Sequence, residues 1–231
     1  KNVKDCFEPL NRATFALNQN LDKIILKPIA KGYRTLPSPV RTGTSNVLDN
    51  LSNLITIPNN VLQGELGKAG INTGRLVINT TIGILGIFDV ADSLGFPEYV
   101  KEDYGQTLGS YGVGPGCYLV LPVLGPSTIR DTAGSFANVL GGDPWYNASI
   151  YGNNEFLNEG VFMTSKALSG IEFRANNIES LDNLEKNSVD FYASVKSLYL
   201  QDRENKIENQ NRGNIEVIYK NEEDWEEIDS Q

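Results

Sequence analysis

The sequence predicts an all-helical protein, and three observations lead to that prediction. Apolar residues return every three or four positions in several stretches, most clearly in Phe7–Arg34. The alternating pattern of a half-buried strand is weak throughout the chain. The 231 residues include 22 glycines and 10 prolines, which interrupt the apolar pattern repeatedly. We therefore expect many short helices rather than a few long ones.

The first two helices are expected at Phe7–Arg34 and Val40–Leu54. Pro28 should kink the first helix or end its first segment. The second follows the Leu-Pro-Ser-Pro stretch at 36–39 and should be broken by Ile-Thr-Ile-Pro-Asn-Asn at 55–60. The first helix has an apolar face and a face with basic residues. This pattern is typical of a helix that lies against a membrane or partner, and equally of an ordinary surface helix.

The middle of the chain is rich in glycine. Leu66–Ile87 contains five glycines, which favour either close helix packing or a series of tight turns. A short helix is expected at Phe88–Leu94. A glycine-rich loop at Gly112–Gly116 precedes the apolar run Cys117–Leu124, where Pro122 argues against a central strand.

The second half of the chain should contain three more helices. One is expected to start at Gly125-Pro126-Ser127-Thr128, with Ser127 or Thr128 as its cap, and to run to about Leu140. Gly141–Asn154 should be an aromatic loop, suited to a membrane–water interface or to the edge of a core. Two polar-faced helices follow at Glu155–Leu184 and Asn187–Asn205. We expect one helical domain over residues 1–205 and an acidic, flexible tail over 206–231.

Composition excludes several classes of function. The net charge is −9, and it is uneven, because residues 1–45 carry eight basic and three acidic side chains. The acidic remainder argues against nucleic acid as a partner. The chain has no histidine, which removes the Ser-His-Asp triad and the commonest metal ligand, so we predict no enzyme, no metal and no cofactor. The glycine-rich loop lacks the dinucleotide and P-loop patterns.

The remaining global features concern the cysteines and the membrane. Cys6 and Cys117 form no Cys-x-x-Cys motif, and they are either free thiols or a disulfide that closes a loop of roughly 110 residues. No apolar run reaches the roughly 18 residues of a membrane-spanning helix. No signal peptide is evident, and a chain that begins at Lys1 is expected to be a mature or trimmed product.

Several ordered blocks resemble one family. The strongest are FDVADSLG (88–95) and YGQTLGSYGVGPGCYLVLPVLGPSTIRD (104–131). Supporting blocks are EPLNRATFALNQNLDKIILKPIAKGYR (8–34), PSPVRTGTSNVLDNL (37–51), NNVLQG (59–64), GRLVINTTIG (74–83) and IEFRA (171–175). From about Asp5 to about Ala175 the chain resembles the MlaA/VacJ lipoproteins of the Gram-negative outer membrane.

The resemblance implies a fold, a location and a function. The family fold is a single ring of helices around an amphipathic channel, embedded in the inner leaflet of the outer membrane. Its members withdraw misplaced phospholipid from the outer leaflet, associate with trimeric porins, and pass lipid to a soluble periplasmic carrier. We therefore expect a protein on the periplasmic face of the outer membrane that maintains lipid asymmetry and is lipid-anchored in its precursor.

Two departures from the family pattern concern the cysteines. Cys6 and Cys117 both stand where the family prefers proline. The lipid-modified cysteine of the family lies upstream, so we do not expect Cys6 to carry the lipid. For an extracytoplasmic protein this leaves the disulfide and the free thiols as equal alternatives.

The candidate site residues follow from the resemblance. The channel and gate are assigned to Gln106, Gly112, Gly114, Tyr118, Leu119, Val120, Leu121, Pro122, Val123, Leu124 and Gly125. The possible phosphate contacts are Arg130, Lys166 and Arg174. The lipid-facing rim is expected to use Phe15, Leu21, Ile25, Ile82, Ile84, Leu85, Ile87 and Phe88. Two rival functions are a porin-associated scaffold without transfer activity and a phospholipase; the lack of histidine and of a Gly-x-Ser-x-Gly motif argues against the phospholipase.

Overall fold

The structure is a computed structural model that describes residues 3–151 and 157–211, and its fold is helical, as predicted. In the first half, the elements are α1 (Glu8–Leu21), the π-helical turn η1 (Asp22–Leu26), α2 (Lys27–Arg34), α3 (Ser38–Leu62), α4 (Leu66–Thr81), α5 (Val90–Ser93) and α6 (Tyr104–Ser110). In the second half, they are β1 (Tyr118–Leu121), β2 (Gly125–Thr128), α7 (Ile129–Ala137), the π-helical turn η2 (Asn138–Gly142), α8 (Pro144–Tyr151), α9 (Glu159–Asn176), α10 (Ile178–Asn187) and α11 (Phe191–Asn211).

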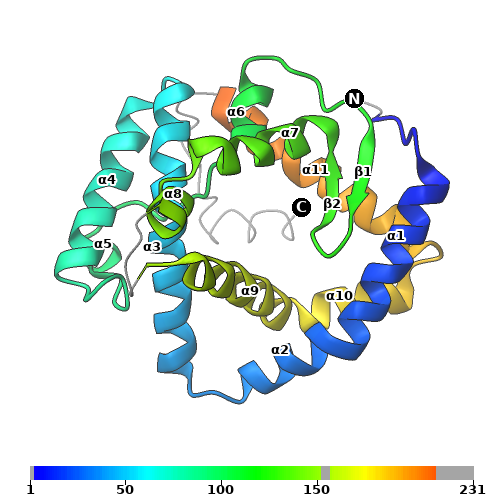
Figure 1. Cartoon of the computed structure of the whole chain (residues 1–231), viewed down its shortest axis with the longest axis horizontal. Helices are drawn as coiled ribbons and strands as arrows, with labels where there is room; N and C mark the ends of the chain where they lie inside the picture. The colour runs from blue at the N-terminus through cyan, green and yellow to red at the C-terminus, as the bar shows by residue number, and fades with distance from the viewer. Residues whose placement is uncertain (1–2, 152–156, 212–231) are drawn as a thin grey trace, which may run out of the picture.

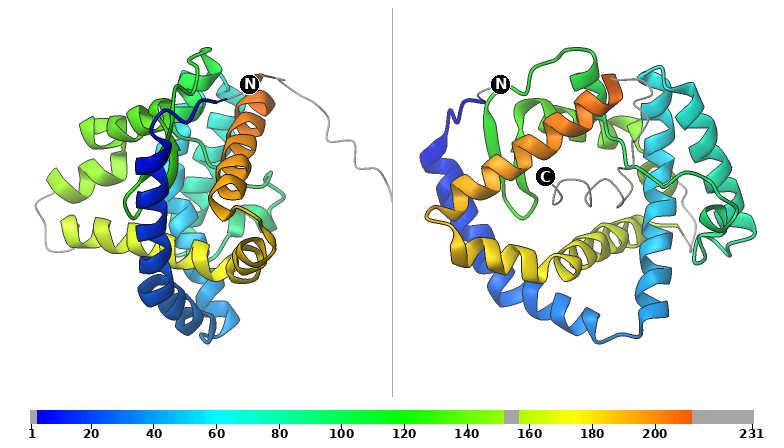
Figure 2. Two further views of the ribbon diagram at one scale, coloured as in Figure 1. Left: turned by 90° about the vertical axis from the view of Figure 1, so that its right-hand side faces the viewer. Right: turned by 180° about the vertical axis from the view of Figure 1, so that it is seen from behind.

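The helices are arranged as a ring, which confirms the expected architecture (Figure 1). The run α1–η1–α2 and the helix α3 form two sides. The helices α9 and α10 run beside α2, and α6 and α7 lie at the opposite edge. Seen from behind, α11 crosses the ring from α10 to α6 (Figure 2). The helices α4 and α5 pack outside α3, so the ring is thickest there.

The first predicted helix is confirmed as one helical stretch with a local distortion. The π-helical turn η1 precedes Pro28, which lies in the first turn of α2. A proline in a first turn needs no partner for its missing N–H, and π-helical turns are a common place for a helix to bend. The bend lets α1 and α2 follow two successive edges of the ring.

The predicted break at 55–60 is wrong. Helix α3 continues through Pro58 to Leu62 and spans 25 residues. Its second half is held by polar contacts with other elements: Thr107 of α6 donates to Asn59, and Asn72 of α4 donates to Asn60. These contacts compensate for the backbone hydrogen bond that Pro58 cannot make.

The segment 118–128, where the strand signal is weak, forms two short strands, and the helix expected to start within 125–128 begins directly after them. Strands β1 and β2 form an antiparallel hairpin in which Tyr118 faces Thr128 and Leu121 faces Gly125. Pro122 lies in the turn, where its missing N–H costs no ladder bond. The helix starts at Ile129, and the predicted cap Thr128 is confirmed, because its side chain accepts a bond from the backbone N–H of Asp131 at 3.1 Å.

The C-terminal boundaries differ from the predictions. The predicted loop at 141–154 contains helix α8. The single helix predicted at 155–184 is two helices, α9 and α10, separated at Asn177. Helix α11 extends to Asn211, six residues beyond the predicted end of the domain. Residues 152–156 and 212–231, which include most of the predicted tail, lie outside the described part of the chain.

The apolar core is small for a chain of this length. One cluster contains Ala30, Ala175 and Ile178 where α2 meets α9 and α10. A second contains Tyr118, Val120 and Tyr192, with Phe15 packed against it. The predicted rim residue Phe15 is therefore half-buried against this core, edge-to-face with Tyr192 at 5.5 Å between ring centroids. Many other large apolar side chains point outward.

Candidate functional site

The hairpin β1–β2 is fastened along one edge to helix α1. The side-chain amide of Asn11 donates to the carbonyl oxygen of Tyr118 at 3.0 Å and accepts from the N–H of Val120 at 2.9 Å. Two helical turns later, Asn18 repeats the arrangement: it donates to the carbonyl of Leu121 at 2.9 Å and accepts from the N–H of Val123 at 2.8 Å. Each amide offers one donor and one acceptor, as a neighbouring strand would. The edge of the hairpin is thus paired without a third strand.

A covalent link joins the base of the hairpin to the same part of the chain. Of the two alternatives for the cysteines, the structure has the disulfide: Cys6 is bonded to Cys117, with 5.6 Å between their Cα atoms. Next to it, the N–H of Tyr118 donates to the carbonyl of Lys4 at 2.9 Å. The base of the hairpin is therefore fixed, whereas its tip depends on Asn18.

The tip of the hairpin is exposed and apolar. Val123 and Leu124 expose 78% and 79% of their surface, and Val123 adopts a positive φ of 66°. A left-handed conformation is unfavourable for a β-branched residue, so the tip is a locally strained turn. Within the predicted gate, Pro122, Val123 and Leu124 are thus accessible. Tyr118 and Val120 are buried in the core, and Leu119, Leu121 and Gly125 are half-buried.

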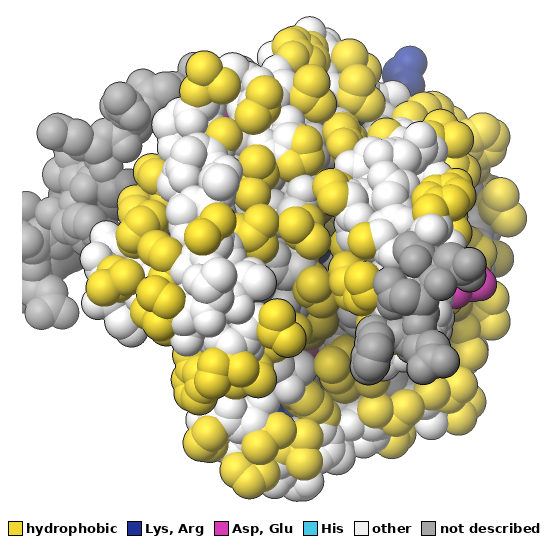
Figure 3. Space-filling model, turned by 60° about the vertical axis from the view of Figure 1, so that its left-hand side comes forward, with side chains coloured by type: hydrophobic (Ala, Val, Ile, Leu, Met, Phe, Trp, Pro, Cys, Tyr) yellow, Lys and Arg dark blue, Asp and Glu magenta, His cyan; other side chains and the backbone are white. Residues whose placement is uncertain are grey.

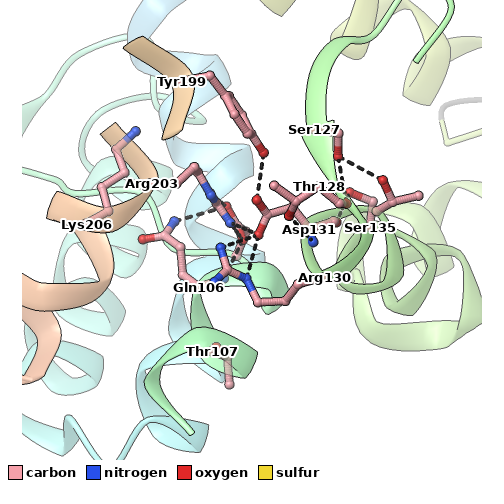
Figure 4. Close-up of polar contacts among 12 residues, drawn as sticks. Gln106, Thr107, Ser127, Thr128, Arg130, Asp131, Ser135, Tyr199, Arg203 and Lys206 are labelled. Atoms are coloured by element: carbon pink, nitrogen blue, oxygen red, sulfur yellow. Dashed lines mark hydrogen bonds and ion pairs between the residues drawn. The ribbon is translucent and has the colours of Figure 1, made fainter. Parts of the chain in front are cut away.

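A charged cluster lies behind the hairpin, where α6, α7 and α11 meet (Figure 4). Arg203 of α11 donates to both carboxylate oxygens of Asp103 at 2.6 and 2.9 Å, and to Asp131 at 2.9 Å. Tyr199 donates to the other oxygen of Asp131 at 2.7 Å. Burial alone would raise the pKa of Asp103 and of Asp131, but the hydrogen bonds and charge of Arg203 outweigh burial and lower both. This cluster joins the last helix to the opposite side of the ring.

The predicted residues Gln106 and Arg130 belong to this cluster. Gln106 is buried, and its side chain donates to Asp103 at 3.0 Å and to the carbonyl of Lys101 at 3.3 Å. Arg130 is also buried, and it is paired with Asp131 at 2.9 Å. The structure therefore gives both side chains intramolecular partners. Gly112 and Gly114 lie in the exposed loop that follows α6.

The other two predicted phosphate contacts differ in their accessibility. Arg174 is buried, and it is paired with Asp22 at 2.8 Å and Asp182 at 3.1 Å. Lys166 is exposed on α9, where its ammonium group lies 5.0 Å from the ring centroid of Phe162 and 3.5 Å from a carboxylate oxygen of Asp143. Of the three candidates, only Lys166 has an exposed side chain.

Two further charged side chains are accessible and yet desolvated. Asp49 of α3 and Lys101, which precedes α6, both expose much of their surface. Nevertheless, burial raises the pKa of Asp49, and the charge of Glu172 raises it further. Burial likewise lowers the pKa of Lys101, with Lys166 as the next cause. Asp49, Lys101, Lys166 and Glu172, on α3, α9 and the segment before α6, are therefore near enough for their charges to act on one another.

The outer face over α4 and α5 is apolar. Figure 3 shows hydrophobic side chains spread across it and few charged ones. The turn after α4 contributes the exposed side chains of Ile82, Ile84, Leu85, Ile87 and Phe88, which confirms their predicted exposure. Ile25 is also exposed, whereas Leu21 is half-buried. No helix in the described ranges is both long and apolar enough to cross a membrane.

Sequence reasoning missed the residues that organise this site. Asn11 and Asn18 look like an ordinary polar helix face until the hairpin is seen beside them. Arg203 lies at the end of the predicted domain, 100 positions from Asp103. Only the seven-residue spacing of the two asparagines gave a signal, since it places both on one face of α1.

Comparisons with known proteins agree on one family. Residues 3–206 match the family described as "MlaA lipoprotein". The chain is 34% identical over 202 residues to the "Intermembrane phospholipid transport system lipoprotein MlaA" of Escherichia coli (strain K12), covering 85% of this chain and 76% of that protein. An "Uncharacterized protein" of Rickettsia bellii is 35% identical over 216 residues, covering 90% and 78%.

A solved structure has the same fold. It is reported as "Structural basis for maintenance of bacterial outer membrane lipid asymmetry", and its TM-score is 0.76 at 33% sequence identity. The alignment covers 88% of this chain and 99% of the solved chain. The ring of helices is therefore shared by both proteins.

Proposed function

The chain belongs to the MlaA lipoprotein family, and we propose that it takes part in intermembrane phospholipid transport at the outer membrane. In this proposal it removes phospholipid that has reached the outer leaflet, so that the two leaflets keep different lipids. The lipid travels through the ring and is passed to a soluble periplasmic carrier. The observation that carries the proposal is the combination, in one ring, of an apolar outer face and a group of interacting charges on α3, α9 and the segment before α6.

The energetics of lipid extraction explain why both surfaces are needed. A phospholipid has roughly 30 methylenes, and exposing them to water costs on the order of 25 kcal/mol at about 0.8 kcal/mol each. A transfer protein must therefore keep the chains in contact with lipid or apolar protein while the charged head group moves. A polar path beside an apolar surface meets both demands.

The outer face supplies the apolar surface. The exposed side chains around Ile82–Phe88 would lie among the acyl chains of the inner leaflet, with the helices parallel to the membrane plane. Gly83 keeps this turn compact, because a Cβ atom there would lie 2.2 Å from the carbonyl oxygen of Phe88. The turn also places Ile84 and Leu85 at positive φ, so their side chains project outward from a fixed backbone.

The interacting charges on α3, α9 and the segment before α6 supply the polar path. Asp49, Lys101, Lys166 and Glu172 carry two charges of each sign on elements that face one another. A zwitterionic head group finds partners there for both of its charges, and an anionic head group finds partners for its phosphate. We propose Lys166 as a phosphate contact, because its ammonium group is exposed. Lys101 is a second candidate on the same grounds.

The hairpin is proposed as the gate of this path, with its exposed tip Val123 and Leu124 as the moving part. Its base is fixed by the disulfide, so movement must occur near the turn and in the loop that contains Gly112 and Gly114. The partners of the family, a trimeric porin and a soluble periplasmic lipid-binding carrier, are proposed for this chain as well. Nothing in the proposal requires chemical conversion of the lipid, so the chain acts as a conduit and not as an enzyme.

The test is transfer of a labelled phospholipid. The protein is reconstituted in vesicles that carry the label in one leaflet, and a purified carrier is added outside. Movement of intact lipid to the carrier supports the conduit. Release of fatty acid would identify a phospholipase. If neither transfer nor hydrolysis is observed, the scaffold role remains.

The gate is tested by two matched substitutions. Gly114→Ala stiffens the loop, yet a Cβ atom at Gly114 meets nothing within 4 Å and its φ is not positive. Gly32→Ala in α2 meets the same two conditions and serves as the control. Restricting the loop by about 0.4–1 kcal/mol should slow transfer about two- to fivefold in the first variant only. Equal transfer rates in both variants would show that the loop is not part of the gate.

A further inference from the structure

A small polar cavity lies between α3 and α4, apart from the hairpin. Its volume is about 30 Å³, which is room for one or two groups the size of a water molecule. The lining residues are Asn46, Asp49, Asn50, Asn53, Arg75, Asn79, Asp89 and Tyr99. All of them are polar, in a part of the molecule whose outer surface is apolar.

Two amide oxygens in this cavity have no hydrogen-bond partner within the described residues. Asn50 and Asn53 are both more than nine-tenths buried, and their Oδ1 atoms are unsatisfied. Their amide nitrogens are already engaged: Asn50 donates to Thr80 at 2.9 Å, and Asn53 donates to the carbonyl of Asn72 at 2.8 Å. These bonds fix both amides with their oxygens free. An unsatisfied buried acceptor is costly, so a donor is expected to occupy the cavity.

The charge of the cavity is also uncompensated. Arg75 is paired with Asp89 at 2.6 Å and donates to the carbonyl of Pro97 at 2.8 Å. This pairing leaves Asp49 as the remaining charge among the lining residues. Asp49 is exposed, so it stands at the mouth, near enough to Glu172 of α9 that the two carboxylates repel. A cation at the mouth would relieve that repulsion.

The backbone of the turn after α4 helps to fix the position of these acceptors. Gly86, at a φ of 90°, packs directly on Asn50, and a Cβ atom at position 86 would lie 2.7 Å from the Cβ atom of Asn50. The apolar turn that faces outward therefore also holds one wall of the polar cavity. Asn50 and Asn53 lie within one turn of each other on α3, which places both oxygens on the same side of the helix.

We infer that this cavity binds a primary ammonium group, and that its source is the ethanolamine head group of a transported phospholipid. An alkylammonium group has three N–H donors and one positive charge, which match two amide oxygens and one carboxylate. A divalent metal suits the cavity less well, because Ca²⁺ and Mg²⁺ need six or more oxygen ligands, and a cavity of about 30 Å³ has no room for the waters that would complete such a set. A trimethylammonium group has no N–H to donate.

The inference of a lipid source rests on the proposed transport function, but the binding site does not. Ethanolamine and glycerophosphoethanolamine are therefore tested first, as soluble probes, on the whole protein. The readout is the movement of the side-chain amide NMR signals of Asn50 and Asn53. We expect saturable shifts with both probes and none with choline. Asp49→Asn should weaken binding about tenfold or more, since it removes one charge-assisted hydrogen bond.

A matched variant controls for net charge. Asp92→Asn removes one carboxylate from exposed α5, outside the cavity, and should leave binding unchanged. Loss of binding in both variants, equal binding of choline, displacement of the probe by Mg²⁺, or no probe binding at all would each overturn the inference. The last of these outcomes would mean that the cavity holds only water.

The lipid source is tested by transfer from vesicles that contain equal amounts of labelled phosphatidylethanolamine and phosphatidylglycerol. The native chain should transfer the first lipid faster, and Asp49→Asn should remove that preference while phosphatidylglycerol still moves. Equal rates for both lipids with the native chain would overturn the lipid source. Probe binding without transfer of either lipid would overturn the transport function and leave the ammonium site in place.

Discussion

The clamp between Asn18 and the tip of the hairpin allows one prediction to be worked out in detail. Asn18→Ala removes the bonds to the carbonyl of Leu121 and from the N–H of Val123, at 2.9 and 2.8 Å. Each bond contributes about 0.5–1.5 kcal/mol net, so the tip should open more easily by about 1–3 kcal/mol. The base should not respond, because Asn11 still holds Val120 at 2.9 Å.

The assay is amide hydrogen exchange, resolved by residue. A difference of about 1–3 kcal/mol corresponds to exchange about 5- to 150-fold faster at Val123. Exchange at Val120 should change little. Asn20→Ala, at an exposed position on the same helix, is the control.

The result that would refute this reasoning is unchanged exchange at Val123 in the Asn18 variant. Equal acceleration at Val120 and Val123 would also refute it, since the hairpin would then open as one unit. If the tip is the gate, the same variant should also transfer lipid faster or leak lipid without a carrier.

Three further predictions concern stability. Arg203→Met leaves Asp103 without its cationic partner and Asp131 with Arg130 alone, and it should lower the free energy of unfolding by about 3–5 kcal/mol at neutral pH. Since both carboxylates have lowered pKa values, this loss should shrink as the pH falls below about 4, which urea unfolding across pH measures. Replacing Cys6 and Cys117 by serine should cost up to about 4–5 kcal/mol by the chain-entropy model, and unfolding of native protein with and without reductant should show the same difference. Glu102→Gln should stabilise the protein at high pH. Burial raises the pKa of Glu102 from 4.5 to about 7, so the folded state holds the proton more tightly than the unfolded state does. The free energy of unfolding of the native protein should therefore fall by about 3 kcal/mol as the pH rises between these values. The gain should vanish below pH 4.5, and a gain that persists there would contradict the assignment.

The sequence predicted most of what depends on local pattern. Helical spacing located α1, α2 and the first part of α3, and the short polar side chain of Thr128 marked the start of α7. The ordered blocks around 88–95 and 104–131 led to the correct family. These features depend on residues close together in the chain, which a single sequence displays directly.

The errors share one physical cause, which is contact between distant residues. Pro58 does not end α3, because partners in α4 and α6 hold the helix beyond it. Strand β1 forms because Asn11 and Asn18 pair with it from more than 100 positions away. Arg174 has a similarly distant partner, since Asp22 lies 152 positions away. Contacts with such partners override the local secondary-structure propensity.

The way the ring closes has a consequence for how the chain folds. Asp5 accepts hydrogen bonds from Tyr192 and Lys196, which lie 187 and 191 positions later. Contacts of this sequence separation form slowly, because the entropy of closing so long a loop is lost before any contact compensates for it. We therefore expect the first helices to form an open arc, with their apolar sides uncovered, until α11 has been synthesised and docks. During that interval the chain is most prone to aggregation, and we expect its folding to depend on a chaperone that shields the arc.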